Sequence, residues 1–130
     1  MNKLVVALLT GCTLAGAGVA VAAPNAASEI RTAAAHASLA AKASDVQSVH
    51  THLHHVLNCL VGPSGKGFDV TNANPCAGSG NGAIPDSTYP ASKKQLRAAA
   101  KYAMSGIAQT DLARAQKRAI DVEGAIARAK

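Results

Sequence analysis

Apolar side chains recur every three or four positions in the segment that begins at residue 46. The positions are Val46, Val49, Leu53, Val56, Leu57 and Leu60. At about 100° per residue these side chains fall on one stripe of an α-helix. The pattern therefore predicts a helix that packs this stripe against a core and leaves its two flanks partly open to solvent.

Capping residues give the boundaries of the other predicted helices. Ser44-Asp45-Val46-Gln47 and Ser92-Lys93-Lys94-Gln95 both fit the capping box, in which a serine hydroxyl accepts from an amide of the first turn and a glutamine reaches back. Thr110-Asp111 places an acidic residue at the start of a further helix. We expect four helices, near residues 26–41, 45–60, 92–106 and 111–129.

Residues 62–90 separate the second and third of these helices and hold six glycines and four prolines. That composition predicts a long irregular loop with no regular element. Two helical hairpins, residues 26–60 and 92–129, would then be joined by this loop into a small all-α four-helix bundle.

The composition favours the same architecture. Alanine dominates the chain, tryptophan is absent, and the aromatic residues are one phenylalanine and two tyrosines. Alanine is the best helix former. A core without large side chains forms only where thin helices approach one another closely.

The N-terminal segment has the order of a secretory signal peptide. Lys3 is followed by an apolar run that ends in Ala20-Val21-Ala22, a small-residue cleavage site. We therefore expect residues 1–22 to be removed, leaving a single helical domain over residues 23–130 in the periplasm or secreted. Two alternatives remain. An uncleaved apolar run of about 20 residues can span a bilayer, and Leu9-Thr10-Gly11-Cys12 resembles a lipobox in which Cys12 is lipidated.

Removal of Cys12 would leave Cys59 and Cys76. An even cysteine count in a small exported protein predicts a disulfide between them, which would tie the middle of the loop to the second helix. The alternative is a catalytic thiol or a thiolate metal ligand. The absence of a CxxC spacing disfavours that alternative.

Histidines surround the apolar stripe of the second helix. His50 and His54, one turn apart, lie on one flank, with His36 of the preceding helix nearby if the helical register continues through the turn. His52 and His55 lie on the other flank, together with Cys59. Each pair could present two imidazoles to one ion, and imidazole suits copper, zinc and nickel, with copper(II) highest in the affinity order. The alternative is that these are boundary residues, half packed and half solvated.

This alanine-rich helical pattern resembles the small metal-binding proteins of the bacterial periplasm, whose family binds copper and other divalent ions. The resemblance covers mainly Ala35-His36 through Leu60, where His36, His50 and His54 keep a similar helical spacing. It implies a metal site on these histidines. The chain departs from the family by having no histidine after His55 and by its cysteine-bearing loop, so binding of many ions is not implied. The segment Leu53 to Cys59 with Asn74-Pro75-Cys76 also looks like uncharacterised bacterial exported proteins, which implies no activity.

Charge is concentrated in the second hairpin. From Lys93 onward nine basic residues face only Asp111, Asp121 and Glu123. This hairpin could contact an anionic envelope surface, or it is simply a solvated basic face. Export and the scarcity of aromatic residues argue against a nucleic-acid partner.

The chain offers no motif that would make it an enzyme. No CxxCH sequence for haem attachment is present. No paired catalytic carboxylates and no nucleophile with its base can be identified. The sequence specifies neither the metal nor an oligomeric state. It favours an exported, non-enzymatic protein that binds copper or another divalent transition metal, with a structural, envelope-associated protein as the alternative.

Overall fold

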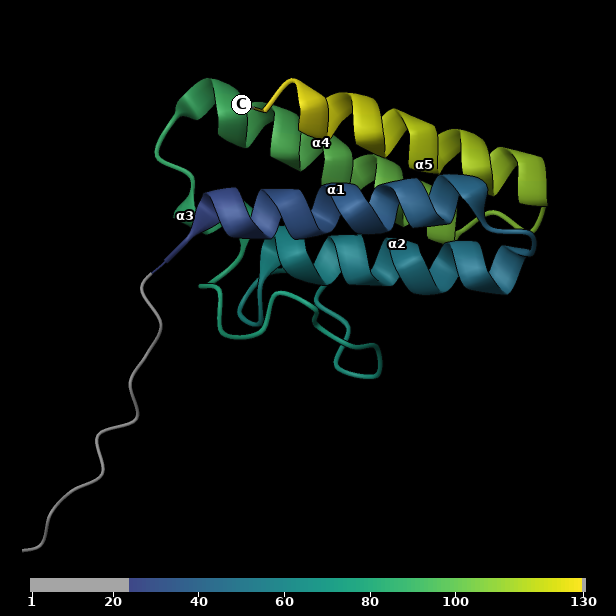
Figure 1. Ribbon diagram of the computed structural model, residues 1–130, viewed down its shortest axis with the longest axis horizontal. Coiled ribbons are helices and arrows are strands. Elements are labelled where there is room, and N and C mark those ends of the chain that lie inside the picture. Colours follow the sequence, from purple (N-terminus) through teal and green to yellow (C-terminus); the bar gives the residue numbers. More distant parts are fainter. Residues whose placement is uncertain (1–23, 130) are drawn as a thin grey trace, which may run out of the picture.

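The computed structural model describes residues 24–129, and this part of the chain consists of helices and contains no strand. The helices are α1 (Ala26–Lys42), α2 (Val46–Val61), α3 (Ala83–Asp86), α4 (Pro90–Ile107) and α5 (Leu112–Ala127). The expected all-α fold is confirmed for these residues, and the arrangement in Figure 1 is compatible with a helical bundle. The expected signal peptide, residues 1–22, lies outside the described residues. Within residues 24–129, every helix is too short or too polar to cross a membrane.

Each of the four long helices contacts at least two of the others. α1 packs along α2 and α4 along α5, while α1 also contacts α5 and α2 contacts α4. Figure 1 shows α1 and α2 side by side, with α4 and α5 forming the other pair. The apolar sides of α1 and α2 are therefore buried against those of α5 and α4.

Two of the three helix starts predicted from capping residues are wrong in detail. α2 begins after Asp45, whose carboxylate accepts hydrogen bonds from the amide and the hydroxyl of Ser48 at 2.8 and 2.7 Å, so Asp45 is the cap in place of Ser44. α4 begins at Pro90, because proline suits the first turn of a helix. Ser92 therefore lies inside the helix, where its hydroxyl donates to the carbonyl of Ala129. The start at Asp111 holds, since its side chain caps α5 through the amide of Arg114.

The core is thin because it is built largely from alanine. Alanines contribute much of the fully buried surface of α1, α4 and α5, and the largest fully buried side chains are Leu53, Leu60 and Leu96. Gly106 of α4 lies against Leu53 of α2 and Arg118 of α5, so closely that a Cβ at this position would collide with the leucine. The small residues thus allow the close helix packing that the composition predicts.

The expectation that the loop contains no regular element is wrong at one place. The single-turn helix α3 forms at residues 83–86 and packs against α1, α2 and α4. Glu29 of α1 is 1% exposed, and its Oε1 accepts the amide of Gly82 at 2.9 Å, which holds the start of α3 against α1. A contact with a residue so distant in sequence outweighs the local glycine and proline signals.

The loop is tied to α2 by the expected disulfide, which is present between Cys59 and Cys76, with the two Cα atoms 5.2 Å apart. Asn58, next to Cys59, is fully buried and binds the same loop. Its side-chain amide donates to the carbonyls of Asp69, Asn72 and Ala73, and its Oδ1 accepts the amide of Asp69 at 2.8 Å. In Figure 1 the loop accordingly runs beneath α2.

Replacing both cysteines, Cys59→Ser with Cys76→Ser, is expected to lower the free energy of unfolding. The bond spans 17 residues, and closing a loop of that size stabilises a protein by roughly 3 kcal/mol in the chain-entropy model. Urea unfolding followed by circular dichroism measures the change, and the parent protein in reductant is the control. An unchanged midpoint in both samples would contradict a stabilising role of the disulfide.

Candidate metal centre

The hairpin of α1 and α2 places three histidines at a similar distance from the turn that joins the two helices. The helices are antiparallel and joined by the turn Ala43 to Asp45. His36 lies eight residues before Ser44 at the centre of the turn, and His52 lies eight residues after it. At 1.5 Å per residue both histidines lie about 12 Å from the turn. His55 follows His52 by three residues and therefore points to the same side of α2.

The three imidazole rings converge on one another. His36 Nδ1 is 3.2 Å from His52 Nδ1 and 3.4 Å from His55 Nδ1. One nitrogen from each ring lies within 4.8 Å of the other two, and all three side chains are half-buried. Within residues 24–129 this is the one group of three histidine, cysteine or acidic side chains placed to share an ion, so the cluster could hold a metal ion.

No choice of ring protonation gives His36 Nδ1 a proper hydrogen bond to both neighbouring rings. In a neutral imidazole Nδ1 carries either one hydrogen or one lone pair. His36 Nδ1 can therefore form a proper hydrogen bond with His52 or with His55, but not with both at once. A metal ion at the centre of the three rings would accept a lone pair from each nitrogen.

The environment of the cluster favours the neutral form of His36 and His55. Burial lowers the pKa of His36, and the nearby His55 and His52 lower it further, because a second positive charge would be repelled. The pKa of His55 is lowered for the same reasons, first by burial and then by His52 and His54. Neutral imidazole is the form that binds a metal.

The predicted pairing of His50 with His54 and His36 differs from the structure. His50 points toward the second hairpin, where its Nε2–H donates to the carbonyl of Gln109 at 2.8 Å. That bond positions the N-terminal part of α2 against the turn between α4 and α5. His50 therefore has a structural partner and lies apart from His36.

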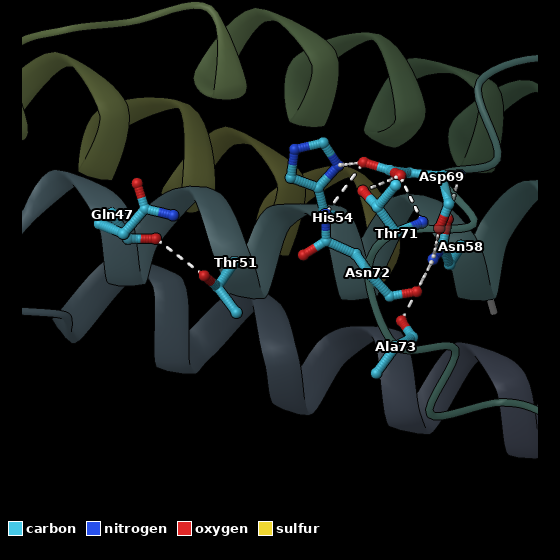
Figure 2. A network of polar contacts seen from close by, with 8 residues as sticks. All are labelled: Gln47, Thr51, His54, Asn58, Asp69, Thr71, Asn72 and Ala73. Atoms are coloured by element: carbon cyan, nitrogen blue, oxygen red, sulfur yellow. Dashed lines mark hydrogen bonds and ion pairs between the residues drawn. The ribbon is translucent and has the colours of Figure 1, made fainter.

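His54 points in a third direction, toward the loop. Figure 2 shows its ring beside Asp69, with Nδ1 at 3.1 Å from Oδ2 of that carboxylate. Hydrogen bonds from the hydroxyl and amide of Thr71 and from the side chain of Asn72 lower the pKa of Asp69 to about 2, with a smaller contribution from His54. The carboxylate is thus ionised at neutral pH and lies within ion-pair distance of the His54 ring.

The predicted neighbourhood of His52, His55 and Cys59 also changes. The two histidines do lie together, and His36 joins them from α1. The sulfur of Cys59 is bonded to Cys76, so it is not a thiolate ligand. The sequence signal for the observed group is that His36 and His52 are equally far from the turn. The pattern of α2 alone does not contain this signal, because His36 belongs to α1.

Acidification is expected to destabilise the metal-free protein through this cluster. The folded pKa values of His36 and His55 lie below the unfolded value near 6.5, so between them the unfolded chain binds more protons. The free energy of unfolding then falls as the pH drops through about 6.5. Burial raises the pKa of Glu29 above its ordinary value of 4.5, which acts in the opposite sense at lower pH.

The measurement is the melting temperature in chelator between about pH 7.5 and 5.5, a window that spans the unfolded histidine pKa of about 6.5. The melting temperature of His36→Gln should fall by a few degrees less over this pH range than that of the parent. His50→Gln serves as the control for loss of a histidine outside the cluster. Parallel curves for the parent and His36→Gln would contradict this account.

No protein-family model, curated protein or solved structure matches the chain. The resemblance to periplasmic metal-binding proteins therefore depends on the histidines of α1 and α2 alone. The function has to be inferred from the geometry of the site.

Proposed function

We propose that this is an exported, non-enzymatic protein that binds a divalent transition-metal ion through His36, His52 and His55. The convergence of their three Nδ1 atoms at 3.2 and 3.4 Å from His36 carries the proposal. The scaffold would be a four-helix bundle of two hairpins, in which α1 and α2 together supply every ligand.

The two nitrogen–nitrogen distances from His36, to His52 and to His55, fit a tetrahedral ion. With metal–nitrogen bonds of about 2.0–2.1 Å, two ligands of a tetrahedral site lie about 3.3 Å apart. Adjacent ligands of a square-planar copper(II) site would lie closer, at about 2.8 Å. The geometry therefore favours zinc, whereas the usual affinity order favours copper(II), which would draw the rings together by about 0.5 Å. Three protein ligands leave a fourth position for water or a further ligand.

Export is the part of the proposal that rests on the sequence. The order of charge, apolar run and Ala20-Val21-Ala22 supports a cleaved signal peptide. The disulfide between Cys59 and Cys76 is typical of oxidising compartments. A periplasmic or secreted protein with a histidine site would meet metal ions directly from its surroundings.

Calorimetric titration with zinc and with copper(II) at neutral pH tests the site. We expect one ion per chain. Replacement of outer-shell partners costs about 10–100-fold in metal affinity, so removing a ligand with His36→Gln or His52→Gln should cost about 100-fold or more. Acidification should weaken binding, because protons compete for the same nitrogens.

The matched control is the double variant His50→Gln with His54→Gln. It removes two histidines of the same helix that have other partners, and its affinity should equal that of the parent. Circular dichroism verifies the fold of each variant. Loss of affinity in the control with retention in His36→Gln would move the site to the other flank of α2, and no binding by the parent protein would overturn the proposal.

A further inference from the structure

A second candidate site lies away from the histidines, between the end of α2, the loop after it, α3 and α4. It is a cavity of about 520 Å³. That size falls within the range of about 300–1,000 Å³ for small-molecule sites. Its apolar walls come from Val61, Ile84, Pro85, Ala100 and Met104. These side chains are aliphatic or a thioether, so they suit an alkyl chain and offer no aromatic face for stacking.

Four basic side chains surround this apolar surface. Lys93, Arg97 and Lys101 follow one face of α4 at intervals of four residues, and Lys66 lies on the loop. The residues lining the cavity include no aspartate or glutamate, and within residues 24–129 none of the four cations forms an ion pair. Lys93 Nζ lies 3.4 Å from the carbonyl of Pro85, which places its charge where α3 meets α4.

The cavity has an apolar wall and a basic surround, so it suits a ligand with an apolar part and an anionic part. Burial of an alkyl chain against the aliphatic wall is favourable because it removes apolar surface from water. Several cations around one cavity favour an anion with more than one charge, and the Arg97 guanidinium can bind phosphate oxygens in a bidentate manner. An amphipathic helix of three turns would occupy on the order of 1,500 Å³, which exceeds the cavity.

We propose that this cavity binds a single-chain amphiphile that carries a phosphate headgroup. The alkyl chain lies along Val61, Ile84 and Met104, and the phosphate is held by Arg97 and Lys101 with Lys66 across the opening. This binding is independent of the metal centre, because no residue of the cavity belongs to α1 or to the histidine cluster.

Calorimetric titration of the purified protein with decyl phosphate, in chelator and below the concentration at which the amphiphile aggregates, tests the proposal. We expect one molecule per chain. Decanoate, with a single charge, should bind more weakly, and inorganic phosphate or decyltrimethylammonium should not bind measurably. Amide NMR shifts should be confined to the end of α2, the loop after it, α3 and α4.

The double variant Arg97→Gln with Lys101→Gln should weaken binding of decyl phosphate about tenfold, since it removes two exposed charge pairs with the phosphate. Lys42→Gln with Lys94→Gln removes the same net charge from exposed positions outside the cavity and should leave the affinity unchanged. Met104→Gln separates the apolar contribution and should also weaken binding.

Equal losses in the two double variants would overturn the cavity as the site and indicate general charge attraction. Equal affinity for decanoate would overturn the phosphate headgroup. Binding to vesicles of an anionic phospholipid without binding to monomeric decyl phosphate would overturn the proposal in favour of a surface contact.

Discussion

The close approach of α1 to α2 is the constraint on which the rest of the structure depends. Ala33, Ala37 and Ala40 give α1 a fully buried face with almost no side-chain volume, so α2 and α5, the two long helices that contact α1, can both approach it closely. The metal centre is a consequence of that packing, because imidazoles from two helices reach each other only when the helices are close. Larger residues on α1 would fill the core better but would hold His36 away from His52.

Much of this hairpin follows from local patterns in the sequence. The apolar stripe of α2 needs only the helical period, and the cysteine pairing follows from the two cysteines that remain if Cys12 is removed with residues 1–22. The grouping of the histidines needs more, because α2 has two flanks and the period does not say which of them faces α1. The turn from Ala43 to Asp45 places His36 and His52 at equal distances along their helices. The packing of α1 against α2 then determines that the flank with His52 and His55 is the one that meets His36. The flank with His50 instead meets the carbonyl of Gln109, a contact across 59 residues that no local pattern predicts.

The capping boxes failed for a related reason. Ser44 and Ser92 have the residue types that a cap requires, but stronger signals lie next to them. Asp45 binds Ser48 with both carboxylate oxygens, and Pro90 with its fixed φ begins α4 two residues earlier. The hydroxyl of Ser92 then finds its partner at Ala129, at the far end of the chain. A cap predicted from sequence is therefore a competition between adjacent residues, and tertiary contacts decide which of them wins.

The same long-range contacts create the second candidate site. α3 is too short to form by itself and is held by the buried carboxylate of Glu29, which accepts the amide of Gly82. Gly62, at the end of α2 with a φ of 68°, lies against Asn81 and Gly82 so closely that no Cβ fits there. These two contacts fold the loop back over the end of α2 and place Ile84 and Pro85 opposite α4, which closes one wall of the cavity. The metal centre thus depends on the first hairpin alone, whereas the cavity needs the loop, α3 and the second hairpin together, so the two sites are built from separate parts of one small fold.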